Sequence, residues 1–148
     1  MAGAGIDIKL DGLEDVQEML QGIARRNADL TPAMEGIGEV LVSQIQRSFE
    51  AGTAPGGGAW PPSIRARREG GQTLVLSSIL KNSINYQAGP SQVSAGTNKV
   101  YAAIHNYGGQ AGRGRKTKIP ARTFIPGQES VDWPEIRNVL ESYLMEGQ

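Results

Sequence analysis

The sequence predicts an α+β domain with two long N-terminal helices, a small antiparallel sheet with long glycine-rich loops, and a C-terminal helix. Apolar residues recur at helical spacing in three segments, 13–28, 31–52 and 133–144. Shorter β-prone runs precede and separate these segments, which is typical of strands. Many of the 20 glycines and 8 prolines cluster in 52–71 and 108–127. Long loops are expected there, because these residues interrupt regular structure.

The length and composition indicate one domain, residues 1–148, of a protein outside the membrane. Compact domains usually hold roughly 100 to 150 residues. The absence of cysteine excludes disulfides and thiolate metal sites, and it fits folding in a reducing cytosol. The first residues lack the pattern of a signal peptide, and no run of about 18 apolar residues is present. We therefore expect neither secretion nor membrane insertion.

The charges are strongly segregated along the chain, although the formal net charge is +0. Residues 60–122 hold ten of the 15 Lys and Arg residues and a single acid, Glu69. The rest of the chain holds five basic and fourteen acidic residues. Such segregation is informative about partners, because surfaces of opposite charge attract each other.

Local spacing predicts the first three elements. Alternating apolar residues over 6–10 predict a strand, and a helix is expected over 13–28. Thr31 and Pro32 predict the start of the second helix, with the Thr31 hydroxyl as the N-cap and proline in the first turn. Gly52 is expected to end this helix. Its apolar stripe consists of Ile37, Leu41, Ile45 and Phe49.

The middle of the chain is predicted to hold a long loop, a short helix and a hairpin. Residues 52–73 show little periodicity, and an irregular loop of about twenty residues is unusual unless it is functional or disordered. Apolar spacing over 76–84 predicts a short helix with Ser77 as its cap. The runs 83–88 and 92–96 flank a Gly-Pro turn and predict a β-hairpin.

Segment 100–107 fits either a helical turn or a strand, and we favour a short helix that ends at the following Gly-Gly pair. Its apolar side consists of Val100, Ala103, Ile104 and Tyr107. A second loop is expected at 108–118, followed by a final strand over 119–125. Trp133 and Pro134 then open the C-terminal helix.

No enzyme activity, cofactor or metal site is predicted. His105 is the only histidine, so a packing or interface role is favoured over a metal site or a catalytic triad. Segment 109–117 comes close to a phosphate-binding loop, but Arg115 separates its second glycine from the lysine. Pro120 also disfavours the helix that such a loop requires. The acidic residues lie mostly outside the apolar stripes, which is typical of solvated helix faces.

Two dense cationic groups are the candidate interface or DNA-facing sites. They lie at 65–68 in the first long loop and at 113–118 in the second. Such groups bind phosphates or an acidic surface of a neighbouring protein, and a solvated loop without a partner is the alternative. The residues of these groups are Arg65, Arg67, Arg68, Arg113, Arg115, Lys116 and Lys118, and Arg122 is a further candidate of the same kind.

Four residues are candidate anchors of a loop or of an interface: Trp60, His105, Tyr107 and Phe124. Trp60 stands between a glycine run and two prolines, outside any apolar stripe. It anchors either the loop in the protein's own core or a contact with a partner. We favour the first, because a long glycine-rich loop needs an apolar contact to hold its end.

Several short blocks stand in a recognisable order along most of the chain, from the second helix to the last. Phe49 is followed by a glycine-rich stretch that ends at Trp60, and then by LSSILKNSI at 76–84. The blocks YAAIHNYGG at 101–109 and IPARTFI at 119–125 complete the order. In these blocks the sequence resembles the phage virion morphogenesis family, the tail-completion proteins of Mu-like phages.

The resemblance implies a structural virion protein that completes the tail end and helps to join tail to head, without enzyme activity. It implies a ring of identical subunits, six by analogy with tail symmetry, which contacts neighbouring head-tail connector and tail proteins. The expected place is the neck or tail end of the virion, after assembly in the host cytoplasm. DNA that passes through the channel is a further candidate partner.

Two kinds of subunit contact are compatible with such a ring. Segment 119–125 could pair with the edge of a neighbouring subunit. The acidic helices of one subunit could also meet the basic 60–122 region of the next. A nucleic-acid-binding protein that uses the loops 65–68 and 113–118 is the alternative function.

Overall fold

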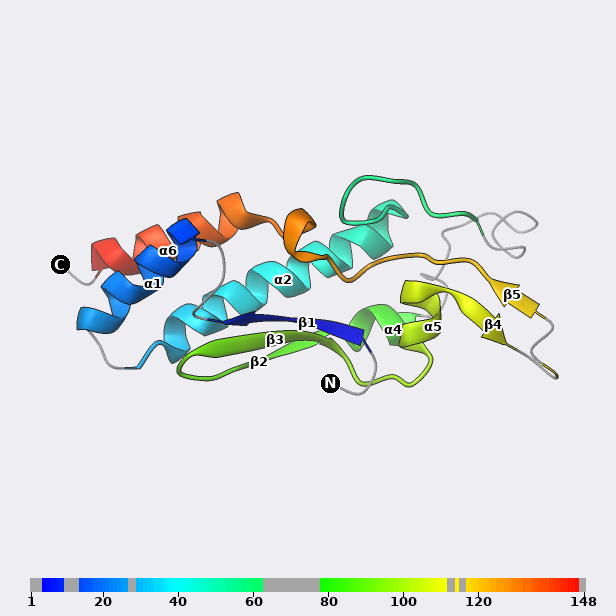
Figure 1. Cartoon of the computed structure of the whole chain (residues 1–148), viewed down its shortest axis with the longest axis horizontal. Helices are drawn as coiled ribbons and strands as arrows, with labels where there is room; N and C mark the ends of the chain where they lie inside the picture. The colour runs from blue at the N-terminus through cyan, green and yellow to red at the C-terminus, as the bar shows by residue number, and fades with distance from the viewer. Residues whose placement is uncertain are drawn as a thin grey trace.

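The structure, a computed structural model, describes residues 4–9, 14–26, 29–62, 78–111, 114 and 117–146. A long helix runs along the long axis of the molecule, a small sheet lies beside it, and two further helices pack together at one end (Figure 1). This mixture of helices and small antiparallel sheets confirms the predicted α+β class. The elements are β1 (Ala4–Lys9), α1 (Glu14–Arg26), α2 (Thr31–Ala51), α4 (Ser78–Asn82), β2 (Asn85–Ala88), β3 (Gln92–Thr97), α5 (Ala102–Tyr107), β4 (Gly109–Ala111), β5 (Thr117–Ile119) and α6 (Trp133–Glu146), with a 3-10 turn at Gln128–Ser130.

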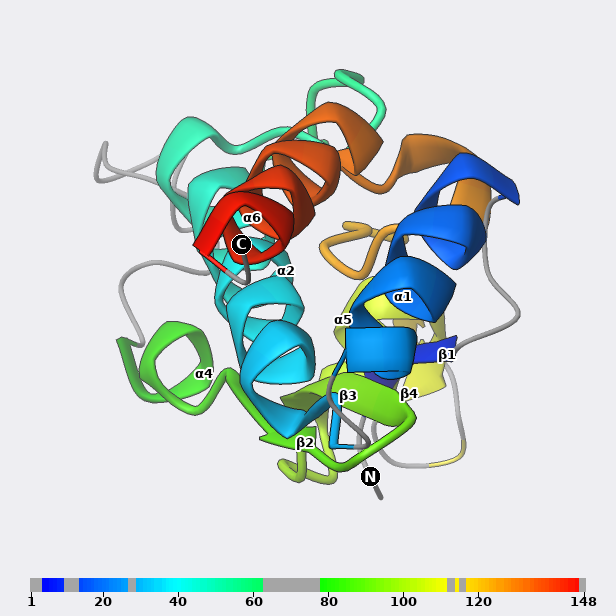
Figure 2. The same cartoon turned by 90° about the vertical axis from the view of Figure 1, so that its left-hand side faces the viewer.

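The long helices cover one face of a three-stranded sheet. The strand order is β1-β3-β2, and both pairs are antiparallel. Helix α2 packs on β2 and β3, and α6 packs in turn on α1 and α2. Figure 2 shows this layering from one end, with the sheet below α1 and α2, and with α6 above α2 and beside α1. The buried apolar side chains of these elements form one core cluster.

The three strands of this sheet confirm the predicted strand and hairpin. β1 begins at Ala4, slightly before the predicted start, and Ile6 lies opposite Ala95 of β3. β2 and β3 form the predicted hairpin. Gly96 permits the close approach of β1, because a Cβ atom at this position would lie 2.0 Å from the Ala4 carbonyl oxygen.

Helix α2 is the central element of the core, as its apolar stripe predicts. The residues of the stripe are fully buried: Ile37, Leu41, Ile45 and Phe49. Two glycines let neighbouring elements come close. A Cβ atom on Gly36 would lie 2.7 Å from Val139 Cγ1 of α6, and one on Gly38 would lie 2.5 Å from the Tyr86 ring of β2. The sheet and α6 therefore both pack directly against the α2 backbone.

The start of α2 differs from the prediction, whereas its end agrees with it. Leu30 occupies the N-cap position without a side-chain cap hydrogen bond, so Thr31 is not the cap. The Asp29 carboxylate instead accepts hydrogen bonds from the backbone N–H, at 2.9 Å, and the hydroxyl of Thr31. An ionised acceptor makes the stronger hydrogen bond, and these contacts lower the pKa of Asp29. Gly52 ends the helix with a φ of 67° and donates to the Ser48 carbonyl oxygen at 2.9 Å.

Helix α4 is shorter than predicted. The helix expected over 76–84 ends at Asn82. Ile84 lies after the end of the helix and is buried, whereas Ile79 lies within the helix and is 61% exposed. The predicted cap, Ser77, lies outside the described residues.

Segment 100–107 contains the helix α5, as favoured, and part of its apolar side faces solvent. Ala102 and Asn106 form its buried face. Val100 and Tyr107 are 86% and 66% exposed. The Asn106 side chain points inward because its oxygen accepts hydrogen bonds from backbone N–H groups of the segment after β5.

The predicted strand over 119–125 was wrong beyond Ile119. Residues 120–125 form no ladder. The backbone N–H groups of Phe124 and Ile125 both donate to Asn106 Oδ1, at 2.9 Å each. Because these donors are satisfied within the chain, this part of the segment cannot pair with the edge of a neighbouring subunit.

Part of the loop predicted at 108–118 is a small hairpin. β4 and β5 are antiparallel, with Gly109 opposite Ile119 and Gln110 opposite Lys118. This hairpin stands at one end of the molecule, far from α1 and α6 (Figure 1). Its position makes it a separate small sheet and not an extension of the larger one.

Candidate functional site

Aromatic contacts hold the end of the first long loop in the protein's own core. Trp60 is 7% exposed, and its ring meets Phe49 edge-on with centroids 5.5 Å apart. Phe124 is fully buried, with its ring centroid 4.8 Å from that of Phe49. The Trp60 indole N–H donates to the Thr123 carbonyl oxygen at 2.8 Å. Trp60 therefore anchors its loop inside the protein, and Phe124 is a core residue without an exposed face.

Arg122 joins the two long loop regions. It is 6% exposed, and its Nε donates to the Pro61 carbonyl oxygen at 2.7 Å. Its backbone N–H donates to the His105 carbonyl oxygen at 2.8 Å. Burial lowers the pKa of the Arg122 guanidinium. This residue was expected at an interface or facing DNA, but in the folded chain it is buried and serves the protein's own structure.

His105 is a half-buried packing residue. The Tyr101 ring meets it edge-on at 6.2 Å between centroids. Burial, and secondarily the positive charge of Arg122, lowers the pKa of the His105 imidazole. Its Nδ1 is buried and has no hydrogen-bond partner among the described residues. Burial and a nearby cation both disfavour the charged form, so His105 is neutral at neutral pH.

Two general properties hold for the described part of the chain. No three His, Asp or Glu side chains among the described residues gather closely enough to hold a metal ion. None of the described helices combines the length and apolarity that a bilayer crossing requires.

Lys118 is the predicted cationic site residue that the structure places on the surface. It is exposed on β5, in the hairpin at one end of the molecule (Figure 1). No Asp or Glu occurs from residue 70 to residue 128, so acids of its own segment cannot neutralise it. Six other predicted cations lie outside the described residues: Arg65, Arg67, Arg68, Arg113, Arg115 and Lys116.

Six exposed glutamates lie in the opposite half of the molecule, whereas the exposed Glu50 lies at the other end of α2. The six lie on α1, on the first half of α2 and on α6, which meet at the end of the long axis away from β4 and β5 (Figure 1). The charge segregation in the sequence is thus partly kept along the long axis, with these glutamates at one end and Lys118 at the other. The exposed glutamates include Glu14, Glu18, Glu35, Glu39, Glu135 and Glu141.

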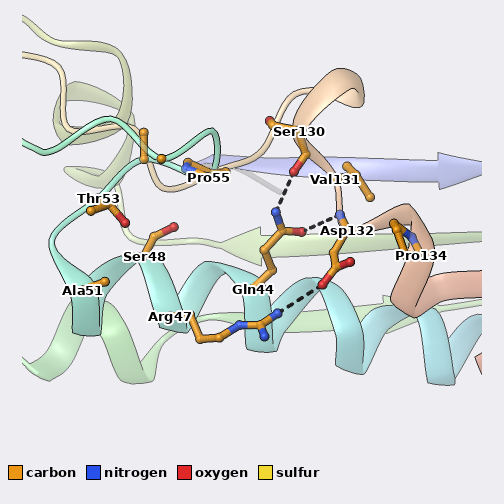
Figure 3. Close-up of a pocket in the computed structure, with 12 residues that line it drawn as sticks. Gln44, Arg47, Ser48, Ala51, Thr53, Pro55, Ser130, Val131, Asp132 and Pro134 are labelled. Carbon is orange, nitrogen blue, oxygen red and sulfur yellow. Dashed lines mark hydrogen bonds and ion pairs between the residues drawn. The ribbon is translucent and has the colours of Figure 1, made fainter. Parts of the chain in front are cut away.

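A hollow of about 450 Å³ lies between the end of α2, the loop that follows it, and the turn before α6. Figure 3 shows how Gln44 bridges two of these elements: its Nε2 donates to the Ser130 carbonyl oxygen at 2.7 Å, and its Oε1 accepts from the Asp132 N–H at 3.0 Å. Arg47 lies 3.5 Å from the Asp132 carboxylate (Figure 3). Sequence reasoning missed Gln44, because nothing in the local pattern singles out one polar residue of a helix.

A second groove, of about 500 Å³, continues between α2 and α6. Val40 and Val139 contribute apolar walls, and Glu39 and Glu135 are exposed at its rim. This groove also escaped sequence reasoning, since it arises from the way two helices distant in sequence pack. The one local signal is Gly36, whose missing side chain lets α6 approach.

The chain belongs to the phage virion morphogenesis family, since the model of that family matches residues 11–145. A role in the structure or assembly of phage particles follows. Mu-like prophage FluMu G protein 2 of Haemophilus influenzae is 36% identical over 120 residues, which are 81% of this chain and 83% of that protein. Putative capsid assembly protein G of Escherichia phage Mu is 33% identical over 95 residues, 57% of this chain and 61% of that protein. No solved structure matches the chain significantly.

Proposed function

We propose that this protein completes the tail end of a phage virion and helps to join tail to head, as a homo-oligomeric ring without enzyme activity. The observation that carries the proposal is the separation of charge along the long axis. Six exposed glutamates of α1, α2 and α6 lie in one half, and the β4–β5 hairpin with the exposed Lys118 lies at the opposite end. Two unlike faces on one subunit favour head-to-tail contacts, which close into a ring when the rotation between subunits permits.

The partners follow from this place in the particle. The ring contacts neighbouring head-tail connector and tail proteins at the neck or tail end, after assembly in the host cytoplasm. Six copies are expected by analogy with tail symmetry, and DNA that passes through the channel is a further candidate partner. The description of the phage Mu relative as a putative capsid assembly protein supports a place in particle assembly.

Electron microscopy of particles made without this protein tests the proposal. Free tails beside filled heads, or tails with abnormal ends, are expected, and the wild-type gene supplied in trans should restore joined particles. Native mass spectrometry of the purified protein at high concentration should show closed oligomers. Normal infectious particles in its absence would contradict the proposal.

The alternative, nucleic-acid binding through the basic loops, draws on the same acid-free segment. A gel-shift titration on random duplex DNA across a salt series separates it from the ring, because phosphate binding must weaken steeply as salt rises. Lys118→Ala, an exposed change, should reduce such binding, whereas Asn98→Ala should not. Absence of any shift at low salt removes this alternative.

A further inference from the structure

Helix α5 presents an apolar stripe to solvent. Val100, Ile104 and Tyr107 are spaced at i, i+4 and i+7, so they share one side of the helix and of the turn before it. Val100 and Tyr107 are 86% and 66% exposed, and Ile104 is half-buried. An exposed aromatic side chain among apolar neighbours marks a protein contact, because such anchors dominate binding energy at interfaces. The α5 stripe, as we name these three residues, therefore needs a partner.

The surroundings of the α5 stripe are positive. Strand β4 follows α5 after one residue, and its partner strand β5 carries the exposed Lys118 opposite Gln110. The whole segment 70–128 lacks acids. A partner for this surface should offer an apolar hollow with an acidic rim, because complementary charge favours the correct encounter.

The groove between α2 and α6 has these properties. It holds about 500 Å³, more than one side chain requires, and its walls include Val40 and Val139. Glu39 and Glu135 stand exposed at its rim. We call it the α2–α6 groove.

Arg47 is the one cationic residue among the described residues that line the α2–α6 groove, and it does not make the groove positive. Arg47 lies 3.5 Å from the Asp132 carboxylate, which also lines the groove. The charges of Arg47 and Asp132 cancel each other, so Glu39 and Glu135 at the rim give the groove a net negative charge. The groove therefore complements the positive surroundings of the α5 stripe.

Helix α5, which carries the α5 stripe, lies away from the α6 helix that forms one wall of the α2–α6 groove (Figure 1). One subunit cannot fill its own groove, but each subunit can offer its stripe to the next and its groove to the previous one. Such a contact between unlike faces is heterologous, and it builds a ring or an open chain of subunits.

We propose that the α5 stripe of one subunit docks into the α2–α6 groove of a second copy of this chain, with Lys118 beside Glu39 or Glu135. The inference rests on the proposed ring and names the surfaces that join its subunits. A different virion protein as occupant of the groove is the competing outcome.

Cross-linking tests the proposal cleanly, because the chain has no native cysteine. Ser43→Cys places a thiol at an exposed position of the groove lining, and Gln110→Cys places one beside the α5 stripe while leaving the stripe and Lys118 intact. With a short bismaleimide, a mixture of the two single variants should give dimers with one copy of each. A chain that carries both changes should give a ladder of oligomers.

Two controls address position and contact. Ser91→Cys, at the exposed β2–β3 turn, replaces Gln110→Cys and should abolish the ladder. Tyr107→Ser should reduce cross-linking at least tenfold and leave the melting temperature unchanged, because the Tyr107 side chain is mostly in solvent. Lys118→Glu should weaken cross-linking, and Glu39→Lys or Glu135→Lys should restore it.

The outcomes separate the docking from the ring. Cross-linked dimers formed by one single-cysteine variant alone would overturn the docking. Cross-linking that Tyr107→Ser does not reduce would also overturn it. If native mass spectrometry shows unchanged rings for Tyr107→Ser, the docking is wrong and the proposed ring stands. A wild-type protein that stays monomeric at high concentration and inside purified particles would remove both.

Discussion

Replacing Asn106 by alanine tests the contact that positions the segment between β5 and α6. Asn106 is 1% exposed, and its Oδ1 accepts the backbone N–H groups of Phe124 and Ile125 at 2.9 Å each. Alanine removes the acceptor and leaves two buried donors unsatisfied. No water can replace it easily, because Phe124 and Ile125 lie in the core.

The expected loss follows from these two donors. A buried unsatisfied donor costs about 1–3 kcal/mol, so the loss of an acceptor for two donors in Asn106→Ala should lower the free energy of unfolding by about 2–6 kcal/mol. A domain of this size has a total stability of about 5–15 kcal/mol. The melting temperature should fall by roughly 5–15 °C, since each kcal/mol is worth a few degrees.

Urea denaturation and amide hydrogen exchange measure the effect. Exchange at the Phe124 and Ile125 amides should speed up more than exchange in the β2–β3 hairpin. Asn98→Ala is the matched control, because Asn98 is exposed and its loss should change stability by less than about 0.5 kcal/mol. If Asn106→Ala is as stable as this control, the account of the 120–125 segment is wrong.

Three further changes have defined outcomes. Gly96→Ala should displace β1, because the added Cβ would lie 2.0 Å from the Ala4 carbonyl oxygen; exchange of β1 amides should rise, whereas Gly89→Ala, with 3.9 Å to its nearest neighbour, should fold normally. Trp60→Phe should lower the free energy of unfolding by about 1 kcal/mol, because the hydrogen bond to the Thr123 carbonyl oxygen is lost, and Trp60→Ala should lower it by about 3–5 kcal/mol, both measured by urea denaturation. Equal losses for the two variants would contradict a packing role of the aromatic side chain of Trp60 in the core. The lowered pKa of His105 means that the unfolded chain binds its proton at a higher pH than the folded one. Stability should therefore fall as the pH drops below about 6.5 and stop falling below the folded pKa. His105→Gln should remove this part of the pH dependence, and identical profiles would refute the assignment.

Some of the candidate site could be predicted and some could not. Trp60 lies in the core as favoured, because a tryptophan after a glycine run has few other ways to be shielded from water. Arg122 was placed with the exposed cations because its neighbours in sequence are basic. Its true surroundings include the Pro61 carbonyl oxygen, 61 residues away, and no local pattern reveals such a partner.

The orientation of the α5 stripe also could not be predicted from the sequence. Its spacing was visible in the sequence, but spacing alone does not decide whether an apolar helix face packs in the core or meets a partner. The structure turns this face outward, since Asn106 must reach the backbone of Phe124 and Ile125. A polar contact with a distant segment thus outweighed the apolar spacing of a six-residue helix.

The sequence by itself determined the α+β class, the β2–β3 hairpin, the buried stripe of α2 and its end at Gly52. These features depend on spacing and turn chemistry within a few residues, and such patterns are read directly from the chain. Only the tertiary structure decided the outward face of α5, the burial of Arg122 and the α2–α6 groove. Each of these depends on contacts between segments far apart in sequence, and their geometry exists only once the core has packed.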